Sequence, residues 1–155
     1  MPIYSIDTSS LVAAWVERYP IRNFPGFWTK LEKAIVSGDI KASVEVIREV
    51  KKRDDSLHAW CKKQRGLAVE IDDACQAHVS SIMAVYPRFV DTRTGKNSGD
   101  PFVIGLALGH TPRLTVVTEE NGGSDARPAI PHVCTARGIK STKLLGLIQT
   151  YGWQF

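Results

Sequence analysis

Cysteine is scarce in this sequence, which has three cysteines among 155 residues and no C-x-x-C pair. That spacing argues against a structural zinc site, and so few cysteines fit a reducing compartment. Long apolar runs are also missing: none approaches the ~20 residues that a membrane-spanning helix needs. The N-terminal segment lacks the basic head and the apolar stretch of a signal peptide. We therefore expect a cytoplasmic protein without a membrane partner.

Several catalytic signatures are absent too. The sequence contains no G-x-G-x-x-G, no Walker lysine loop and no G-x-S-x-G elbow, and its four histidines form no H-x-x-x-H pair. These absences argue against dinucleotide, P-loop, serine-hydrolase and histidine-metal chemistry. Aspartate and glutamate are the chemically interesting residues that remain.

The composition is that of a soluble globular protein, with 43% hydrophobic and 23% charged residues. Its length predicts a single domain covering residues 1–155. The net charge is +4 and the pI is about 9.1, which permits a nucleic-acid partner without requiring one. Basic residues cluster at 51–53 and 62–65, where they could equally form solvated helix faces.

Short apolar segments alternate with segments of helical periodicity along the chain. Strand candidates are residues 2–6, 40–42 and 114–118. Helices are expected over residues 11–18, 24–35 and 131–137, and another is expected to begin at Asp100. Further helices are expected after four capping positions: Ser43, Asp54 or Asp55, Asp72 or Asp73, and Ser141. This order predicts an α/β domain with a mostly parallel sheet. Ligands of such sheets bind beyond the carboxyl ends of the strands, so we expect Asp7 and the pair Glu119–Glu120 on one rim.

Acidic residues stand in informative contexts at the following positions: Asp7, Glu49, Asp100 and Glu120, with Glu45 near the second and Glu119 beside the fourth. Taken singly, each has a plain structural explanation, because Asp is a good helix N-cap and glutamates are often solvated. Taken together, carboxylates that converge on one rim repel each other and persist where a cation neutralises them. Oxygen ligands favour Mg²⁺ or Mn²⁺, and such ions can assist phosphodiester cleavage.

Four segments contain Asp7, Glu49, Asp100 and Glu120 in turn: residues 3–9 (Ile-Tyr-Ser-Ile-Asp-Thr-Ser), 46–50 (Val-Ile-Arg-Glu-Val), 99–107 (Gly-Asp-Pro-Phe-Val-Ile-Gly-Leu-Ala) and 115–120 (Thr-Val-Val-Thr-Glu-Glu). In their order and spacing these segments resemble a PIN domain. Within that superfamily the chain resembles an uncharacterised prokaryotic PIN-like family of the toxin type (VapC-like). Its hallmarks appear here as Phe27-Trp28, residues 130–134, Gly138-Ile139 and the closing segment 151–155. The resemblance covers essentially the whole chain.

The resemblance implies a three-layer sandwich in which helices flank a central, mostly parallel sheet of four or five strands. It also implies a Mg²⁺- or Mn²⁺-dependent endoribonuclease that cuts single-stranded or structured RNA, commonly as the toxin of a toxin–antitoxin pair. The partners would then be an RNA substrate and a cognate antitoxin protein, and the chain could form a homodimer.

By motif position, the resemblance makes Asp7, Glu49, Asp100 and Glu120 the catalytic and metal-binding quartet. Hydroxyl support would come from Thr8, Ser9 or Thr118, with Glu45 and Glu119 as the alternative members of the two glutamate pairs. Two positions depart from the family pattern. The fourth acid is Glu120 where many PIN domains carry Asp, and Gly99 stands where Ala is frequent, which predicts a looser loop before Asp100.

Basic and polar residues near these acids are candidate RNA contacts: Lys51, Lys52, Arg53, Lys96 and Asn97. Two other functions fit the same pattern. One is a non-catalytic PIN-like module that binds RNA or a protein, although such a module has no need of four mutually repelling carboxylates. The other is a metal-dependent DNA nuclease, which we rank lower because the sequence shows no insertion for grasping a duplex.

Overall fold

A five-stranded sheet runs through the centre of the computed structural model, which describes residues 2–155. All four strand pairings are parallel, and the strand order is β3-β2-β1-β4-β5. The strands are β1 (Tyr4–Ile6), β2 (Ile40–Ser43), β3 (Ala68–Val69), β4 (Thr115–Val117) and β5 (Ser141–Thr142). The predicted parallel α/β sheet is confirmed.

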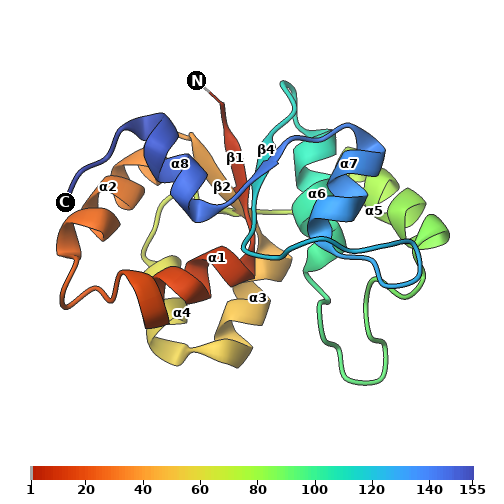
Figure 1. Cartoon of the computed structure of the whole chain (residues 1–155), viewed down its shortest axis with the longest axis horizontal. Coiled ribbons are helices and arrows are strands. Elements are labelled where there is room, and N and C mark those ends of the chain that lie inside the picture. The colour runs from red at the N-terminus through yellow and green to blue at the C-terminus, as the bar shows by residue number, and fades with distance from the viewer. Residues whose placement is uncertain (1) are drawn as a thin grey trace.

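Helices cover both faces of the sheet (Figure 1). They are α1 (Thr8–Val12), which continues as the π-helical segment η1 (Ala13–Arg18), α2 (Pro25–Val36), α3 (Val44–Arg53), α4 (Asp55–Lys62), α5 (Asp73–Val85), α6 (Asp100–Gly109), α7 (Ile130–Arg137) and α8 (Leu144–Tyr151). In Figure 1, α5, α6 and α7 lie on one side of the strands, and α1, α2, α4 and α8 lie on the other. The fold is therefore the expected three-layer sandwich.

The strand order creates a crevice at one edge of the sheet. The chain starts at β1 in the centre, moves outward through β2 and β3, and then returns to β4 on the other side of β1. At such a switch point the connections leave β1 and β4 in opposite directions, which opens a space beyond their carboxyl ends. Asp7 follows β1 directly, and its N–H donates to the Val117 carbonyl at the end of β4, 2.9 Å away.

Helix α6 is buried against the sheet because it is apolar on nearly every side. The Ser5 hydroxyl of β1 donates to the Val103 carbonyl at 2.8 Å, which ties the central strand to this helix. On the outer side, a Cβ atom at Gly105 would lie 2.6 Å from a methyl carbon of Val79. Glycine there lets α5 approach α6 closely. This packing fixes the position of Asp100, the first residue of α6.

Aromatic side chains pack together in the helical layer on the other side of the sheet from α6 (Figure 1). Phe27 and Trp28 of α2 are buried in the core, and the Trp28 indole donates to the Tyr19 carbonyl at 2.6 Å. The C-terminal segment packs on this group, with the Phe155 ring 5.6 Å from the Phe27 ring. Two of the sequence features that suggested the resemblance, Phe27-Trp28 and the closing segment 151–155, pack against each other here.

Local signals predicted several helix starts correctly. The side chains of Ser43, Asp54 and Asp72 each accept a hydrogen bond from a backbone N–H of the helix that follows. The expected cap at Ser141 is wrong, because that residue lies in β5 and α8 begins at Leu144. No described helix is long and apolar enough to cross a membrane.

Candidate metal centre

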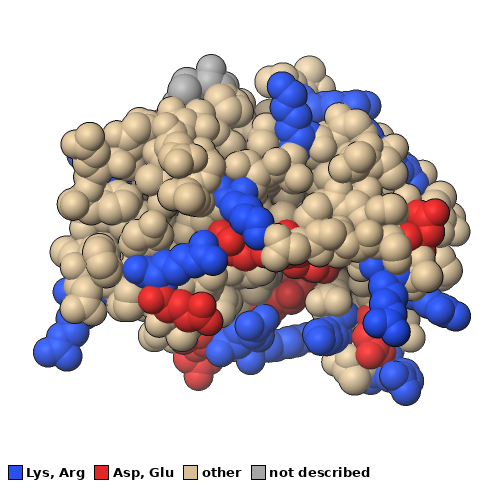
Figure 2. Space-filling model, in the orientation of Figure 1, with Lys and Arg blue, Asp and Glu red and all other residues tan. Residues whose placement is uncertain are grey.

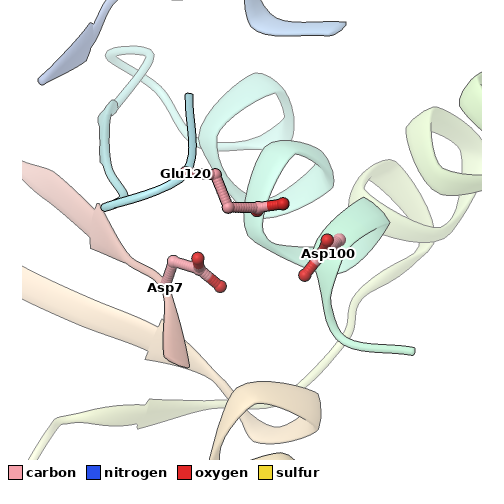
Figure 3. A group of neighbouring side chains, drawn as sticks. All are labelled: Asp7, Asp100 and Glu120. Atoms are coloured by element: carbon pink, nitrogen blue, oxygen red, sulfur yellow. The ribbon is translucent and has the colours of Figure 1, made fainter. Parts of the chain in front are cut away.

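Three carboxylates meet beyond the ends of β1 and β4 (Figure 3). Asp7 comes from the end of β1, Asp100 from the start of α6, and Glu120 from the loop after β4. One oxygen from each can be chosen so that all three oxygens lie within 4.8 Å of one another. Figure 3 shows the three side chains pointing toward a common space. The fold therefore brings together three of the four acids expected at the site.

Asp7 is held in place by two hydroxyl groups. Its side chain is buried, and its Oδ2 accepts hydrogen bonds from Ser9 at 2.6 Å and from Thr118 at 2.9 Å. These hydroxyls accept in turn from the backbone N–H groups of Glu119 and Glu120, at 3.0 and 3.1 Å. The β4 loop thereby orients the carboxylate at the end of β1. The buried hydroxyl of Thr8 makes no such bond.

Asp100 and Glu120 each have a buried carboxylate oxygen without a hydrogen-bond partner among the described residues. Burial raises the pKa of Asp100 to about 10, with further contributions from the charges of Asp7, Glu120 and Glu49. Burial and the Asp7 charge raise the pKa of Glu120 to about 7. Burial also raises the pKa of Asp7 itself. A cluster of this kind lacks the positive charge that would neutralise it.

The helix-cap explanation for the two aspartates does not hold. Asp7 occupies the N-cap position of α1, but its side chain makes no cap hydrogen bond. Asp100 lies one residue inside α6, where Gly99 is the N-cap, and it makes no cap hydrogen bond either. Pro101 is accordingly the second residue of the helix. Neither carboxylate is needed to begin its helix.

Glu49 lies beside the triad and is not one of its three members. Its carboxylate is half-buried and accepts a hydrogen bond from the Gly99 N–H. Burial and then the Asp7 charge raise the pKa of Glu49, while the Gly99 bond opposes that rise. Glu45, one turn earlier on α3, instead forms an ion pair with exposed Arg48.

The sequence suggested that Gly99 loosens the loop before Asp100, and this expectation is wrong, because Gly99 fits closely against Glu49. The loop is tied to α3 through the Gly99 N–H and the Glu49 carboxylate. The backbone of Gly99 is an ordinary helical conformation, with φ −81° and ψ −20°, so no special backbone freedom is needed. A Cβ atom at this position would overlap the Glu49 carboxylate. Any larger residue at position 99 would therefore push the Glu49 carboxylate away from this N–H.

Glu119 points away from the triad. Its Oε1 accepts from the Leu144 N–H at 2.9 Å, and its Oε2 accepts from Arg18 at 3.2 Å. Glu119 thus supplies the cap that α8 lacks locally, since Lys143 makes no side-chain cap bond. The adjacent glutamate, Glu120, is the one that faces the carboxylates.

Glu119→Ala should therefore destabilise the fold. The substitution leaves the Leu144 N–H without its acceptor, and losing such a bond costs about 1–2 kcal/mol. For a domain of this size the melting temperature should fall by about 2–8 °C. Glu119→Gln keeps an oxygen acceptor and should melt close to wild type in the same thermal scan. Equal losses for the two variants would contradict the capping role.

Basic side chains surround the acidic hollow, as Figure 2 shows on one face of the molecule. Lys143 is among the nearest, because its ammonium donates to Asn121 and to the Glu119 carbonyl. Lys143, Asn121 and Glu120 line a cavity of about 270 Å³ next to the triad. This cavity gives a substrate group room beside the carboxylates, with a cation at its wall.

The expected RNA contacts fall in different places. Arg53 lies near Glu49, since its charge lowers the pKa of that glutamate. Lys51 lines a separate cavity between α3 and α4, while Lys52 is exposed on α3. Lys96 and Asn97 lie in the loop before α6, and the Asn97 carbonyl accepts from the Asp100 N–H at 3.1 Å. No pattern in the sequence distinguishes these positions from one another.

The donor set fits a hard divalent cation. All three groups are carboxylates, which suit Mg²⁺ or Mn²⁺, whereas zinc sites usually include cysteine or histidine. Ligand oxygens on one octahedral Mg²⁺ lie about 3.0 Å apart when adjacent and about 4.2 Å apart when opposite, so the three oxygens, which lie within 4.8 Å of one another, would move closer together to share one ion. The cysteines are buried, and burial raises the pKa of Cys134 to about 12. Its thiol remains neutral.

Comparison with known proteins gives one family match. A family model described as a domain of unknown function (DUF4411) matches residues 4–155. That range contains every strand and helix described above and all four predicted acids. No curated protein matches the chain significantly.

Proposed function

This chain belongs to the DUF4411 family, and we propose that it is a divalent-metal-dependent endoribonuclease with a PIN-like active site. The observation that carries the proposal is the buried group of Asp7, Asp100 and Glu120, in which two carboxylate oxygens have no partner. Uncompensated buried carboxylates are costly unless they bind a cation. The crevice at the switch point of a parallel sheet is where such folds bind their ligands.

The three carboxylates would hold Mg²⁺ or Mn²⁺, with Ser9 and Thr118 orienting Asp7. When bound, the ion supplies charge stabilisation at the reacting phosphate and lowers the pKa of the attacking water. Glu49 is held at the edge of the triad by Gly99. From there it can position that water and accept its proton. Lys143 can contact a neighbouring phosphate in the adjoining cavity.

Incubation of the purified protein with labelled single-stranded RNA and millimolar Mn²⁺ tests the proposal. Internal cleavage that EDTA stops and fresh Mn²⁺ restores is the expected result. A single-stranded DNA of the same sequence and a duplex DNA run beside it, because preferential cutting of either would favour the DNA-nuclease alternative. RNA that is bound with metal but not cut would favour the non-catalytic module.

Gly99→Ala should weaken this activity through Glu49. The new methyl group would displace the Glu49 carboxylate from the Gly99 N–H, and loss of such a supporting contact typically costs about 10–100-fold in a metal site. Combining Gly99→Ala with Glu49→Gln should then add little further loss. Gly26→Ala is a matched control, because a Cβ at Gly26 meets nothing within 4 Å. Fully additive losses would show that Gly99 acts independently of Glu49.

A further inference from the structure

Helix α3 presents two functionally different faces. Glu49 points to the loop before α6, whereas Ile47, Arg48 and Lys51 line a groove that α3 forms with α4. An α-helix turns 100° per residue, so Lys51 lies about 160° around α3 from Glu49. The groove has a volume of about 460 Å³ and lies on the far side of the helix from the triad.

The walls of this groove are basic. Arg48, Lys51 and Lys62 line it together with His58, and no aspartate or glutamate is among the lining residues. Lys51 and Lys62 form no ion pair with any described residue, while Arg48 pairs with Glu45. Two ammonium groups on opposite helices thus face the groove without partners, which is an arrangement suited to a polyanion.

The floor of the groove contains an unsatisfied acceptor. The side chain of Gln64 lines the groove, and its Nε2 donates to the Trp60 carbonyl at 3.0 Å, which fixes the orientation of the amide. Its Oε1 is buried and has no hydrogen-bond partner among the described residues. Because this oxygen has almost no exposed surface, a ligand reaches it only if the side chains that cover it move aside. A ligand that completes this site must then bring a donor as well as negative charge. An RNA strand has both, because each ribose 2′-hydroxyl is a donor that DNA lacks.

Basic residues connect this groove to the triad. Arg53 lies one helical turn after Glu49 and lowers its pKa, and Lys52 lies between Arg53 and Lys51 around the helix. A strand that follows them runs around about half the circumference of α3, a path of about 16–19 Å for a helix about 10–12 Å in diameter. At the roughly 3.4 Å per phosphate of a stacked strand, this path corresponds to about five nucleotides.

We propose that the groove between α3 and α4 is a second RNA-binding site, which holds the backbone about five nucleotides from the phosphate at the triad. Lys51 and Lys62 contact phosphates, and the Gln64 oxygen accepts from a 2′-hydroxyl. The inference rests on the proposed nuclease function for the role of the triad. RNA binding in the groove is a separate prediction, because it requires neither metal nor cleavage.

Fluorescence anisotropy with a labelled 12-nucleotide single-stranded RNA in EDTA tests the groove directly. The double variant Lys51→Met/Lys62→Met should weaken binding at least tenfold and reduce the slope of log K against log salt by about 1.4, since each phosphate contact on a single strand contributes about 0.7. Lys30→Met/Lys33→Met removes the same charge from α2, where the two lysines line a different cavity. This control should change the affinity less than threefold. Equal effects of the two double variants would overturn the proposal.

The Gln64 contact has its own readout. Wild-type protein should bind the RNA more tightly than the DNA of the same sequence, and Gln64→Met should reduce that preference while lowering DNA affinity little. Thermal scans check that each variant is folded. An unchanged RNA-to-DNA ratio in a folded Gln64→Met variant would contradict the 2′-hydroxyl contact. A glutamate-rich peptide that binds the groove while RNA does not would identify a protein site instead.

Cleavage kinetics link the groove to the triad. If the nuclease function holds, Lys51→Met/Lys62→Met should raise KM for the 12-nucleotide RNA with kcat little changed, and should leave cleavage of a trinucleotide unaffected. If no RNA is cut, the nuclease proposal fails while the anisotropy result still decides the groove. Equal losses on both substrates would show that the lysines do not form a separate site.

Discussion

Asp100→Asn is expected to lower Mn²⁺-dependent RNA cleavage by on the order of 10³-fold and to leave the fold intact. Asparagine is nearly isosteric with aspartate but carries no charge, so it removes a metal ligand and the electrostatic stabilisation that depends on it. The fold should survive because the Asp100 side chain makes no cap bond and has an oxygen without a partner. Asp7→Asn should have a similar effect on the rate, measured as initial velocity at saturating RNA.

The neighbouring glutamates provide internal controls for this experiment. Glu45→Gln alters a surface ion pair with Arg48, and Glu119→Gln retains the acceptor for Leu144, so both variants should cut at nearly the wild-type rate. Glu49→Gln and Glu120→Gln should be much slower. The reverse order within either pair would mean that the wrong glutamate has been assigned. An Asp100→Asn protein as fast as wild type would remove the triad from the mechanism.

A second large effect is expected in the pH dependence of stability without metal. The pKa of Asp100 rises to about 10 and that of Glu120 to about 7, mainly through burial, and those of Asp7 and Glu49 rise as well. These groups hold protons in the folded chain at pH values where the unfolded chain has lost them. The free energy of unfolding should therefore decrease as pH rises above about 4, by up to about 1.4 kcal/mol per pH unit for each such proton.

Asp100→Asn should flatten this dependence, because the variant has one fewer proton to lose. Without metal it should match wild type near pH 4 and exceed it increasingly up to pH 8, as measured by urea unfolding in EDTA. Metal should act in the opposite direction on wild type. At a hundredfold excess over Kd it stabilises the fold by about 2.7 kcal/mol, which raises the melting temperature by about 5–10 °C.

That metal-induced shift should shrink or vanish in Asp100→Asn. If the variant melts well below wild type without metal and yet keeps the full metal shift, Asp100 is a structural residue. If wild-type stability in EDTA is independent of pH between 5 and 8, the carboxylates are not buried together as described.

The sequence predicted most of what local patterns control. An apolar strand that ends in Asp7 must place that residue on the rim of a parallel sheet, and side-chain acceptors such as Ser43 and Asp72 begin helices wherever the following residues favour them. The helix expected over 11–18 includes the π-helical segment, although the sequence did not indicate its π-helical winding. The strands β3 and β5 were missed, because segments of two residues carry no periodicity.

The details of the site depend on contacts between distant residues. Glu49 and Gly99 are 50 positions apart, and Glu119 caps a helix that begins 25 residues later. No window of sequence contains both members of such a pair, so the close fit at Gly99 and the role of Glu119 could not be anticipated. The same holds for Gln64, whose free oxygen becomes evident only when α3 and α4 are packed together. The antitoxin and homodimer expectations stay predictions of the family resemblance.

Mn²⁺ in the carboxylate triad is the most direct consequence of this account, and anomalous diffraction from a crystal soaked in Mn²⁺ measures it. A peak within about 2.0–2.4 Å of oxygens from Asp7, Asp100 and Glu120 is predicted, and Asp100→Asn crystals treated identically should show a much weaker peak or none. A contradicting result is a fully soaked crystal in which the three carboxylates still face one another but no anomalous density lies between Asp7 and Asp100. It would show that this group does not bind a catalytic metal.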